Sequence, residues 1–419
     1  MTGVDLLVIG IGELATLRTG PIPRVGSAAS ELGRVQNAAL AVRNGVFASV
    51  GPERLVRRSV HLRKGGTEVD AGGGVVVPGF VDAHTHVLYA GDRANELEEK
   101  IRGATYLEIA AAGGGLYRTV RLTRRATKPQ LLRETVPRLR RMLEAGTTTA
   151  EVKSGYALTH AGEIRLLESI PLLAERAGLD LVPTYLGAHA VPPERATTPD
   201  RYVDEVVERT IPEVARRGLA QFVDVFCEPG FFTPSQSERI LRAAMAAHLG
   251  TKIHADEFVY SGGAALAAHL ATHSAEHLLT APADDRAKLA RAGVTAVLLP
   301  VTPFASMSPL QSPGREMVDA GVPVALGSDV SPNSPVESMP IVMAHAVYSA
   351  RLTPAEALTA ATVNAAHAVG AADRAGTIAA GRSADFVLFD LPSADRIAHR
   401  IGSLPVAIYR RGNRVSPTK

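Results

Sequence analysis

The stretch VVVPGFVDAHTHVLYAG, residues 75–91, combines an apolar run of strand character with two histidines that are separated by a single threonine. Successive side chains of a strand point to opposite faces, so His84 and His86 are expected to share one face, with Thr85 turned away. Two imidazoles on one face are well placed to bind one metal ion. In the alternative interpretation, one histidine belongs to the core and the other to the surface.

Beyond this stretch, short β-branched apolar runs alternate with longer segments of helical periodicity, a pattern typical of parallel strands joined by crossover helices. Two of the helical segments, KPQLLRETVPRLRRMLEAG (128–146) and AGEIRLLESIPLLAERAG (161–178), end in glycine, as helices often do. Eight strand-like runs predict an α/β fold, a (β/α)₈ barrel of the TIM type. The runs cover residues 75–83, 147–153, 179–187, 222–228, 250–255, 273–279, 294–300 and 322–328.

The two ends of the chain have a different pattern, with short apolar runs between Gly, Asn and Pro turn signals and without a convincing helix. The predicted strands there are residues 4–9, 38–50 and 385–390, with a hairpin over residues 406–415. We therefore predict a small β-sandwich domain built from both chain ends, residues 1–70 and 373–419, beside a barrel of residues 71–372.

The composition indicates an ordinary globular protein, with 46% hydrophobic and 21% charged residues in a chain of 419. The net charge of +3 comes from 45 basic and 42 acidic residues, and the arginines are scattered, so we expect no nucleic-acid partner. The N-terminus carries Asp5 where a secretory signal would be basic, and no apolar stretch is long enough for a bilayer, so we expect no membrane partner.

Cys227 is the single cysteine of the chain. One cysteine excludes an intrachain disulfide and a zinc site of the CxxC type, which favours a reducing cytoplasm. Because Cys227 lies within an apolar strand run with no evident base nearby, a core thiol is a better interpretation than a nucleophile.

Polar residues at the carboxyl ends of the predicted strands carry the functional prediction, because the active sites of TIM barrels lie at this end. Five of the thirteen histidines fall there, namely His84, His86, His189, His254 and His277, and so do Glu257, Glu276 and Asp329. Three imidazoles and one carboxylate, from His84, His86, His254 and Asp329, would form a zinc-type site with room for a water. Iron or manganese could use the same ligands.

The chemical purpose of such a site is hydrolysis, since a bound divalent cation lowers the pKa of water from 15.7 to roughly 7. A proton carrier is then needed close by, and Glu257 and His277 are the candidates.

The motifs HTH after the first barrel strand, HADE at the fifth, EH at the sixth and SD at the eighth resemble the amidohydrolase superfamily. The longer strings FVDAHTHVLYAGDRANE, TTAEVKSGYALT, TYLGAHAVP, KIHADEF and SAEHL resemble its imidazolonepropionase family, over about residues 70 to 345. This resemblance implies a cytoplasmic and usually dimeric enzyme of histidine degradation that holds one Zn or Fe ion. Its expected reaction is hydrolysis of 4-imidazolone-5-propanoate, a small molecule with a carboxylate tail, to N-formimino-L-glutamate.

Residue by residue, the resemblance implies metal ligands at the same four positions that strand placement suggested, His84, His86, His254 and Asp329. It implies catalytic roles for Glu257, His277 and Asp329. It implies substrate binding by Arg93, Tyr106, Tyr156, His189, Glu257 and Ser334. A propanoate tail calls for a cation, and the guanidinium of Arg93 can meet a carboxylate in a bidentate fork.

The segment DVSPNSP, residues 329–335, departs from the family, whose better-known members are close to DxNPGS or DxNPGT there. Ser331 and Asn333 replace an asparagine and a glycine that touch the substrate, while Ser334 is retained. A second hypothesis therefore stays open, in which the enzyme is a deaminase of the same fold or a cyclic amidohydrolase for a different heterocycle. A catalytically silent metal-binding or scaffold protein is the third.

Lys153 is a further open question. Superfamily members with two metals use a lysine at the end of the fourth strand, and FVDVFCEPG has none, which favours one metal. Lys153 lies on the second strand instead, where it either orients the substrate or pairs with Glu151 or Asp224.

Overall fold

The stretch 75–91 serves two different sheets of the computed structural model, which describes residues 1–104, 108–109 and 112–415. Its first part is strand β5 (Val75–Pro78) of a small sheet, and its second part is β6 (Phe80–Asp82), the first barrel strand. The prediction of one strand over residues 75–83 was therefore wrong. Gly79 joins the two strands. A Cβ atom at this position would lie 2.3 Å from Oγ1 of Thr148, so the residue at which the chain passes from one sheet to the other must be glycine.

Eight parallel strands follow one another around the barrel in chain order, which confirms the predicted (β/α)₈ architecture. Beside β6 they are β7 (Thr147–Lys153), β8 (Asp180–Ala188), β9 (Phe222–Cys227), β10 (Gly250–Ala255), β11 (Ser274–His277), β12 (Thr295–Leu298) and β13 (Val324–Leu326). The last strand returns to the first, because the N–H of Ala83 donates to the carbonyl of Leu326 at 3.2 Å and Thr85 forms a bridge with Val330.

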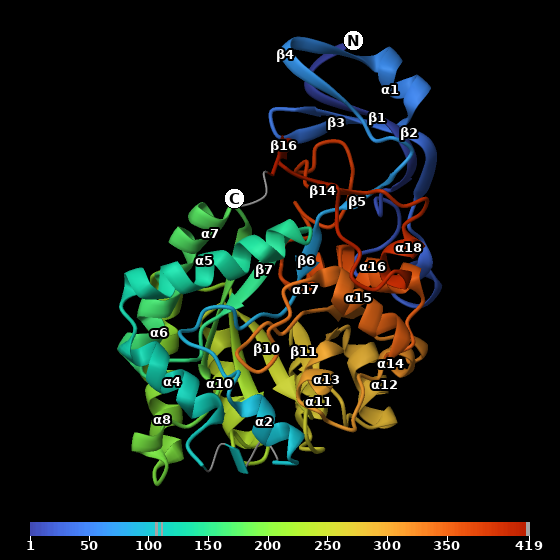
Figure 1. Cartoon of the computed structure of the whole chain (residues 1–419). Coiled ribbons are helices and arrows are strands. Elements are labelled where there is room, and N and C mark those ends of the chain that lie inside the picture. Colours follow the sequence, from blue (N-terminus) through green and yellow to red (C-terminus); the bar gives the residue numbers. More distant parts are fainter. Residues whose placement is uncertain (105–107, 110–111, 416–419) are drawn as a thin grey trace.

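Helices cover the outside of the barrel (Figure 1). They are α2 (Glu96–Ile101), α4 (Gly115–Arg125), α5 (Lys128–Glu144), α6 (His160–Leu167), α7 (Ile170–Ala177), α8 (Pro199–Glu205), α9 (Ile211–Arg216), α10 (Pro234–Ala246), α11 (Gly263–Leu270), α12 (Ala283–Ala292), α13 (Val301–Ala305), α14 (Gly314–Asp319), α15 (Met339–Tyr348), α16 (Pro354–Ala360) and α17 (Val363–Ala368). The predicted helical segment 161–178 forms two helices, because Pro171 starts a new one and cannot continue the hydrogen bonds of the first. Gly178 ends α7 in the left-handed region, with φ of 80°.

The small sheet contains strands from both chain ends, which lie side by side in Figure 1 in blue and red. With β5 they are β1 (Thr2–Ala15), β2 (Arg34–Arg43), β3 (Val46–Pro52), β4 (Val60–Asp70), β14 (Phe386–Phe389), β15 (Ala407–Arg410) and β16 (Asn413–Arg414). The expectation of no helix in these parts was wrong, since α1 (Glu53–Ser59) and α18 (Asp395–His399) lie there. Both are too short for a visible periodicity, and α1 is held by the carboxylate of Glu53, which accepts the N–H of Gly10.

The direction of β6 decides which end of the barrel carries the chemistry. Because β5 of the small sheet leads directly into β6, the amino ends of the parallel barrel strands face the small sheet. Arg410 of β15 forms an ion pair with Asp180 at the start of β8 and thereby joins the two sheets at this end. The carboxyl ends lie at the opposite end of the barrel. Among the described residues, no helix is both long and apolar enough to cross a membrane.

Candidate metal centre and active site

Three imidazole nitrogens and one carboxylate oxygen converge at the carboxyl end of the barrel. Nε2 of His86 lies 3.0 Å from Nε2 of His84 and 3.2 Å from Nε2 of His254. Oδ1 of Asp329 lies 3.5 Å from Nε2 of both His84 and His86. Two ligands bound tetrahedrally at Zn–N distances of about 2.0–2.1 Å are separated by roughly 3.3 Å. All four side chains are buried, and their spacing fits one metal ion at the centre.

Local backbone geometry brings these groups together. His84 and His86 follow the short strand β6, and His254 lies on β10. Asp329 follows β13 with φ of 53°, a left-handed conformation that costs a non-glycine residue of the order of 1 kcal/mol or more. Just before it, Gly327 lies so close to His84 that a Cβ atom would approach the Cβ of His84 to 2.7 Å. The barrel end thus needs glycine at this position to bring Asp329 beside the first histidine.

Carboxylates hold the other face of two of these imidazoles. Nδ1 of His84 contacts Oε2 of Glu276, and Nδ1 of His254 lies 3.0 Å from Oδ2 of Asp224. A carboxylate that accepts the Nδ1–H of a histidine leaves the Nε2 lone pair for a metal ion. Asp329 is oriented in a similar way, because the hydroxyl of Thr302 donates to its Oδ2 at 2.7 Å.

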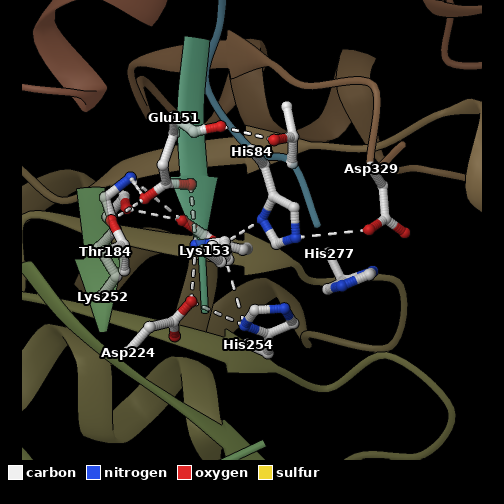
Figure 2. A network of polar contacts seen from close by, with 12 residues as sticks. His84, Glu151, Lys153, Thr184, Asp224, Lys252, His254, His277 and Asp329 are labelled. Carbon is white, nitrogen blue, oxygen red and sulfur yellow. Dashed lines mark hydrogen bonds and ion pairs between the residues drawn. The ribbon is translucent and has the colours of Figure 1, made fainter. Parts of the chain in front are cut away.

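Lys153 lies beside His84 and His254, as Figure 2 shows. Its ammonium is fully buried and contacts carboxylates of Glu151, Asp224 and Glu276. Burial disfavours the charged ammonium, but these three carboxylates hold the pKa of Lys153 above its usual value. Of the two roles considered from the sequence, the structure therefore shows pairing, with both expected partners and with Glu276.

A cavity opens beside the four converging groups. Its lining residues are His86, Arg93, Leu116, Tyr156, His189, Phe226, His254, Glu257, Phe258, His277, Thr302, Asp329, Ser331 and Asn333. The structure thus brings Arg93, Tyr156, His189, Glu257 and His277 together, as the sequence predicted. Ser334 is buried outside this lining and donates its N–H to Oγ of Ser331, and Tyr106 lies outside the described residues.

Arg93 is held at the cavity by the start of α2. Its Nε donates to Oε2 of Glu96 at 2.7 Å, and Oε1 of the same carboxylate accepts the N–H of Gly115 at 2.8 Å. Both side chains are buried. A buried guanidinium in a cavity wall is suited to bind an anionic group.

Glu257 and His277 lie next to each other, with 3.6 Å between Oε1 and Nδ1. Burial raises the pKa of the Glu257 carboxyl well above its usual value, and the carboxylates of Asp329 and Glu228 add to this. Burial lowers the pKa of His277 well below its usual value, and burial likewise lowers the pKa of His189 to about 3. Around the same cavity, the pKa of one carboxyl group is therefore raised and the pKa values of two imidazoles are lowered.

Several lining residues were missed by the sequence interpretation. Thr302 falls just beyond the seventh predicted strand, so the rule of strand ends could have found it. The apolar side chains Leu116, Phe226 and Phe258 carry no such signal.

Asn333 is tied to a distant part of the chain. Its Oδ1 accepts a hydrogen bond from Nζ of Lys100 at 2.7 Å, and its Nδ2 donates to Oγ of Ser306 at 2.9 Å. Lys100 lies on α2, seven positions after Arg93, and was not among the predicted site residues. The residue that departs from the family pattern therefore links α2 to the loop after β13.

In comparisons with known proteins, residues 75–410 match the model of the amidohydrolase family. The chain is similar to imidazolonepropionases over nearly its whole length. That of Symbiobacterium thermophilum is 46% identical over 98% of this chain and 97% of its own. Those of Geobacillus kaustophilus and Chloroflexus aggregans are each 44% identical, over 96% and 98% of this chain and the same shares of their own.

Solved structures with a similar fold are more distant in sequence. An adenosine deaminase from Xanthomonas campestris with bound zinc has a TM-score of 0.72 at 18% identity, over 99% of this chain and 93% of its own. Molinate hydrolase has a TM-score of 0.68 at 17% identity, over 99% of this chain and 95% of its own. These likenesses support the barrel with its small β domain.

Proposed function

We propose how the residues of this chain, which belongs to the imidazolonepropionase family of amidohydrolases, contribute to the opening of a cyclic amide. The enzyme acts in histidine degradation as a metal-dependent hydrolase of a small molecule. Water adds to the ring carbonyl of 4-imidazolone-5-propanoate, the bond from this carbon to the ring nitrogen breaks, and that nitrogen takes up a proton. The product is N-formimino-L-glutamate.

The observation that carries this substrate assignment is the buried guanidinium of Arg93 in the wall of the cavity that also contains the His and Asp cluster. A propanoate tail is an anion that a guanidinium can bind in a fork, whereas an uncharged heterocycle offers it no such group. Glu96 holds the guanidinium in place, so the tail would meet a prearranged partner. Tyr156 and His189 line the same cavity and complete the polar surface around the substrate. Tyr106 and Ser334 remain predicted substrate contacts.

The divalent metal ion of the family would be bound by His84, His86, His254 and Asp329, whose nitrogen and oxygen atoms lie within 3.0–3.5 Å of at least one other member of the set. When bound, it supplies Lewis acidity for the attacking water and for the ring carbonyl. Three nitrogen ligands and one oxygen suit both Zn and Fe, and we propose one such ion per subunit.

Glu257 is proposed as the proton carrier and His277 as the group that holds the carbonyl oxygen. Both line the cavity, and they lie within 3.6 Å of each other. In this scheme Glu257 removes a proton from the attacking water and delivers it to the departing ring nitrogen. His277, whose ring lies 5.2 Å from that of His254 between centroids, donates to the oxygen as charge develops on it.

A cytoplasmic homodimer is proposed from the family resemblance, and the single cysteine fits a reducing compartment. That the enzyme has no nucleic-acid or membrane partner stays a prediction. So do the domain limits at residues 70 and 372.

The experiment that tests the function measures turnover of freshly prepared 4-imidazolone-5-propanoate through the loss of its ultraviolet absorbance. Metal-replete enzyme, enzyme treated with a chelator, and an imidazolone without the tail are compared in parallel. We expect rapid turnover that needs both the metal and the tail. Lack of turnover with metal demonstrably bound would redirect the search to other cyclic amides and to deaminase substrates.

A further inference from the structure

Five charged side chains of the barrel interior lie next to the proposed metal centre, and Figure 2 labels all of them except Glu276. Each has no solvent exposure, and they are Glu151, Lys153, Asp224, Lys252 and Glu276. We call this group of three carboxylates and two ammonium groups the buried ionic cluster. Burying so many charges is costly unless their geometry serves a purpose, since a well-packed apolar core is often at least as stable.

Lys153 contacts the very oxygen atoms that hold two of the proposed metal ligands. Its Nζ lies 2.7 Å from Oδ2 of Asp224, the atom that faces Nδ1 of His254 at 3.0 Å. It also lies 2.9 Å from Oε2 of Glu276, the atom that faces Nδ1 of His84. One ammonium therefore sets the position of two oxygens, and each oxygen in turn orients one imidazole.

Lys252 belongs to the same cluster but touches other atoms. Its Nζ lies 2.9 Å from Oε1 of Glu151 and 3.5 Å from Oε1 of Glu276. Neither oxygen has a contact with a proposed ligand histidine within the described part of the chain. The two lysines thus match in residue type and burial and differ in their link to the metal site.

We propose that Lys153 is a positioning residue that fixes His84 and His254, through Glu276 and Asp224, with Nε2 directed at the metal and so sets the affinity of the site. A ring held at Nδ1 loses little freedom when Nε2 binds a metal ion, and the partners behind metal-bound histidines typically contribute about 10- to 100-fold to affinity. The proposal rests on the ligand set of the proposed function and not on its substrate.

The test compares Lys153→Met with Lys252→Met as metal-free proteins titrated with zinc in competition with a chromophoric chelator. We expect zinc to bind about 10- to 100-fold more weakly to Lys153→Met, and within about threefold of the unaltered protein to Lys252→Met. The visible spectrum of the cobalt-substituted protein should change only for Lys153→Met. Equal zinc affinity in the unaltered and Lys153→Met proteins, or equal losses in both variants, would overturn the proposal and leave the cluster a purely structural role.

A milder pair of variants covers the case in which a lysine variant does not fold. Glu276→Gln changes a carboxylate that holds His84, whereas Glu151→Gln changes one that pairs with the two lysines and accepts a hydrogen bond from Thr184. Zinc affinity should fall in Glu276→Gln and stay nearly constant in Glu151→Gln, and the reverse order would overturn the proposal. The zinc titrations contain no substrate, so they test the role of Lys153 independently of the substrate assignment. A protein that binds zinc as expected but does not turn over 4-imidazolone-5-propanoate would contradict the proposed function alone.

Discussion

The two sides of the cavity are built in different ways. One side, which we call the metal wall, consists of His84, His86, His254 and Asp329 at the ends of barrel strands, with the buried ionic cluster behind it. A second set of lining residues, Arg93, Ser331 and Asn333, lies on loops at the barrel mouth, and we call it the tail wall after the substrate tail that we propose it faces.

This difference suggests that the metal wall determines the chemical step and the tail wall determines the choice of substrate. Buried side chains at or just after strand ends, with further buried groups behind them, can be held to the precision that metal binding and proton transfer need. Loops at a barrel mouth can change without disturbing that core, and they decide which molecule enters. Changes at the metal wall and its proton carrier should therefore act on the chemical step for every substrate, whereas changes at the tail wall should act only on substrates with the tail.

The largest effect is expected from Glu257→Gln, next to the metal wall. Glutamine keeps the shape of the side chain but cannot carry a proton, so kcat should fall by about 10²- to 10⁴-fold while the metal content stays the same. Steady-state kinetics and metal analysis of the purified variant check this. Substrates with and without the tail should lose activity in the same proportion.

Glu228→Gln is the matched control for this variant. The Glu228 carboxylate lies behind the same loop and accepts backbone N–H groups of Glu257 and Val259 at 3.0 and 2.9 Å. The amide of glutamine keeps one acceptor oxygen and loses the other, so one side of this loop loses its hydrogen bond while Glu257 keeps its carboxyl group. A lost hydrogen bond is worth about 1 kcal/mol, so kcat should stay within about tenfold. A comparable loss in both variants would mean that the shape of the loop, and not proton transfer by Glu257, had been measured.

An intermediate effect is expected from Arg93→Ala in the tail wall. A hydrogen bond to a charged group is worth about 1.5–3 kcal/mol, so kcat/KM for the natural substrate should fall by roughly 10- to 150-fold. Slow turnover of the imidazolone without a tail should not change. Arg102→Ala provides the control, because Arg102 follows the same helix, is exposed and forms an ion pair with the exposed Glu98. Equal losses for substrates with and without the tail would break the distinction between the two walls.

The grouping of His84, His86, His254 and Asp329 at one end of the barrel could be predicted from the sequence, because the carboxyl ends of parallel strands meet there whatever the distant contacts are. The alternation in HTH and the positions of His254 and Asp329 after apolar runs were enough to group them. The passage of the chain from the small sheet to the barrel at Gly79 was not predicted. The same apolar run suits either sheet, and the close approach of Thr148 determines the position of the crossing.

The tail wall and the buried ionic cluster depend on contacts that no local pattern encodes. Lys100 and Asn333 are 233 positions apart, and Lys153 and Asp224 are 71 positions apart. A lysine in a strand or a helix has the same local signal whether it faces solvent or a carboxylate in the core. Only the folded arrangement shows that Lys153 pairs with three carboxylates rather than with substrate.

The smallest effect is expected from Asn333→Gly, which restores the family residue in the tail wall. The change removes the hydrogen bonds to Lys100 and Ser306, and water can take the place of Asn333 as their partner. A net loss of about 1 kcal/mol is then expected, so KM for the natural substrate should rise roughly 3- to 10-fold with kcat within about twofold. Ser306→Ala removes only the second bond and should have the smaller effect. If KM falls instead, Asn333 occupies space that the tail needs. The link from α2 to the loop after β13 would then narrow the cavity and would not help to bind the propanoate.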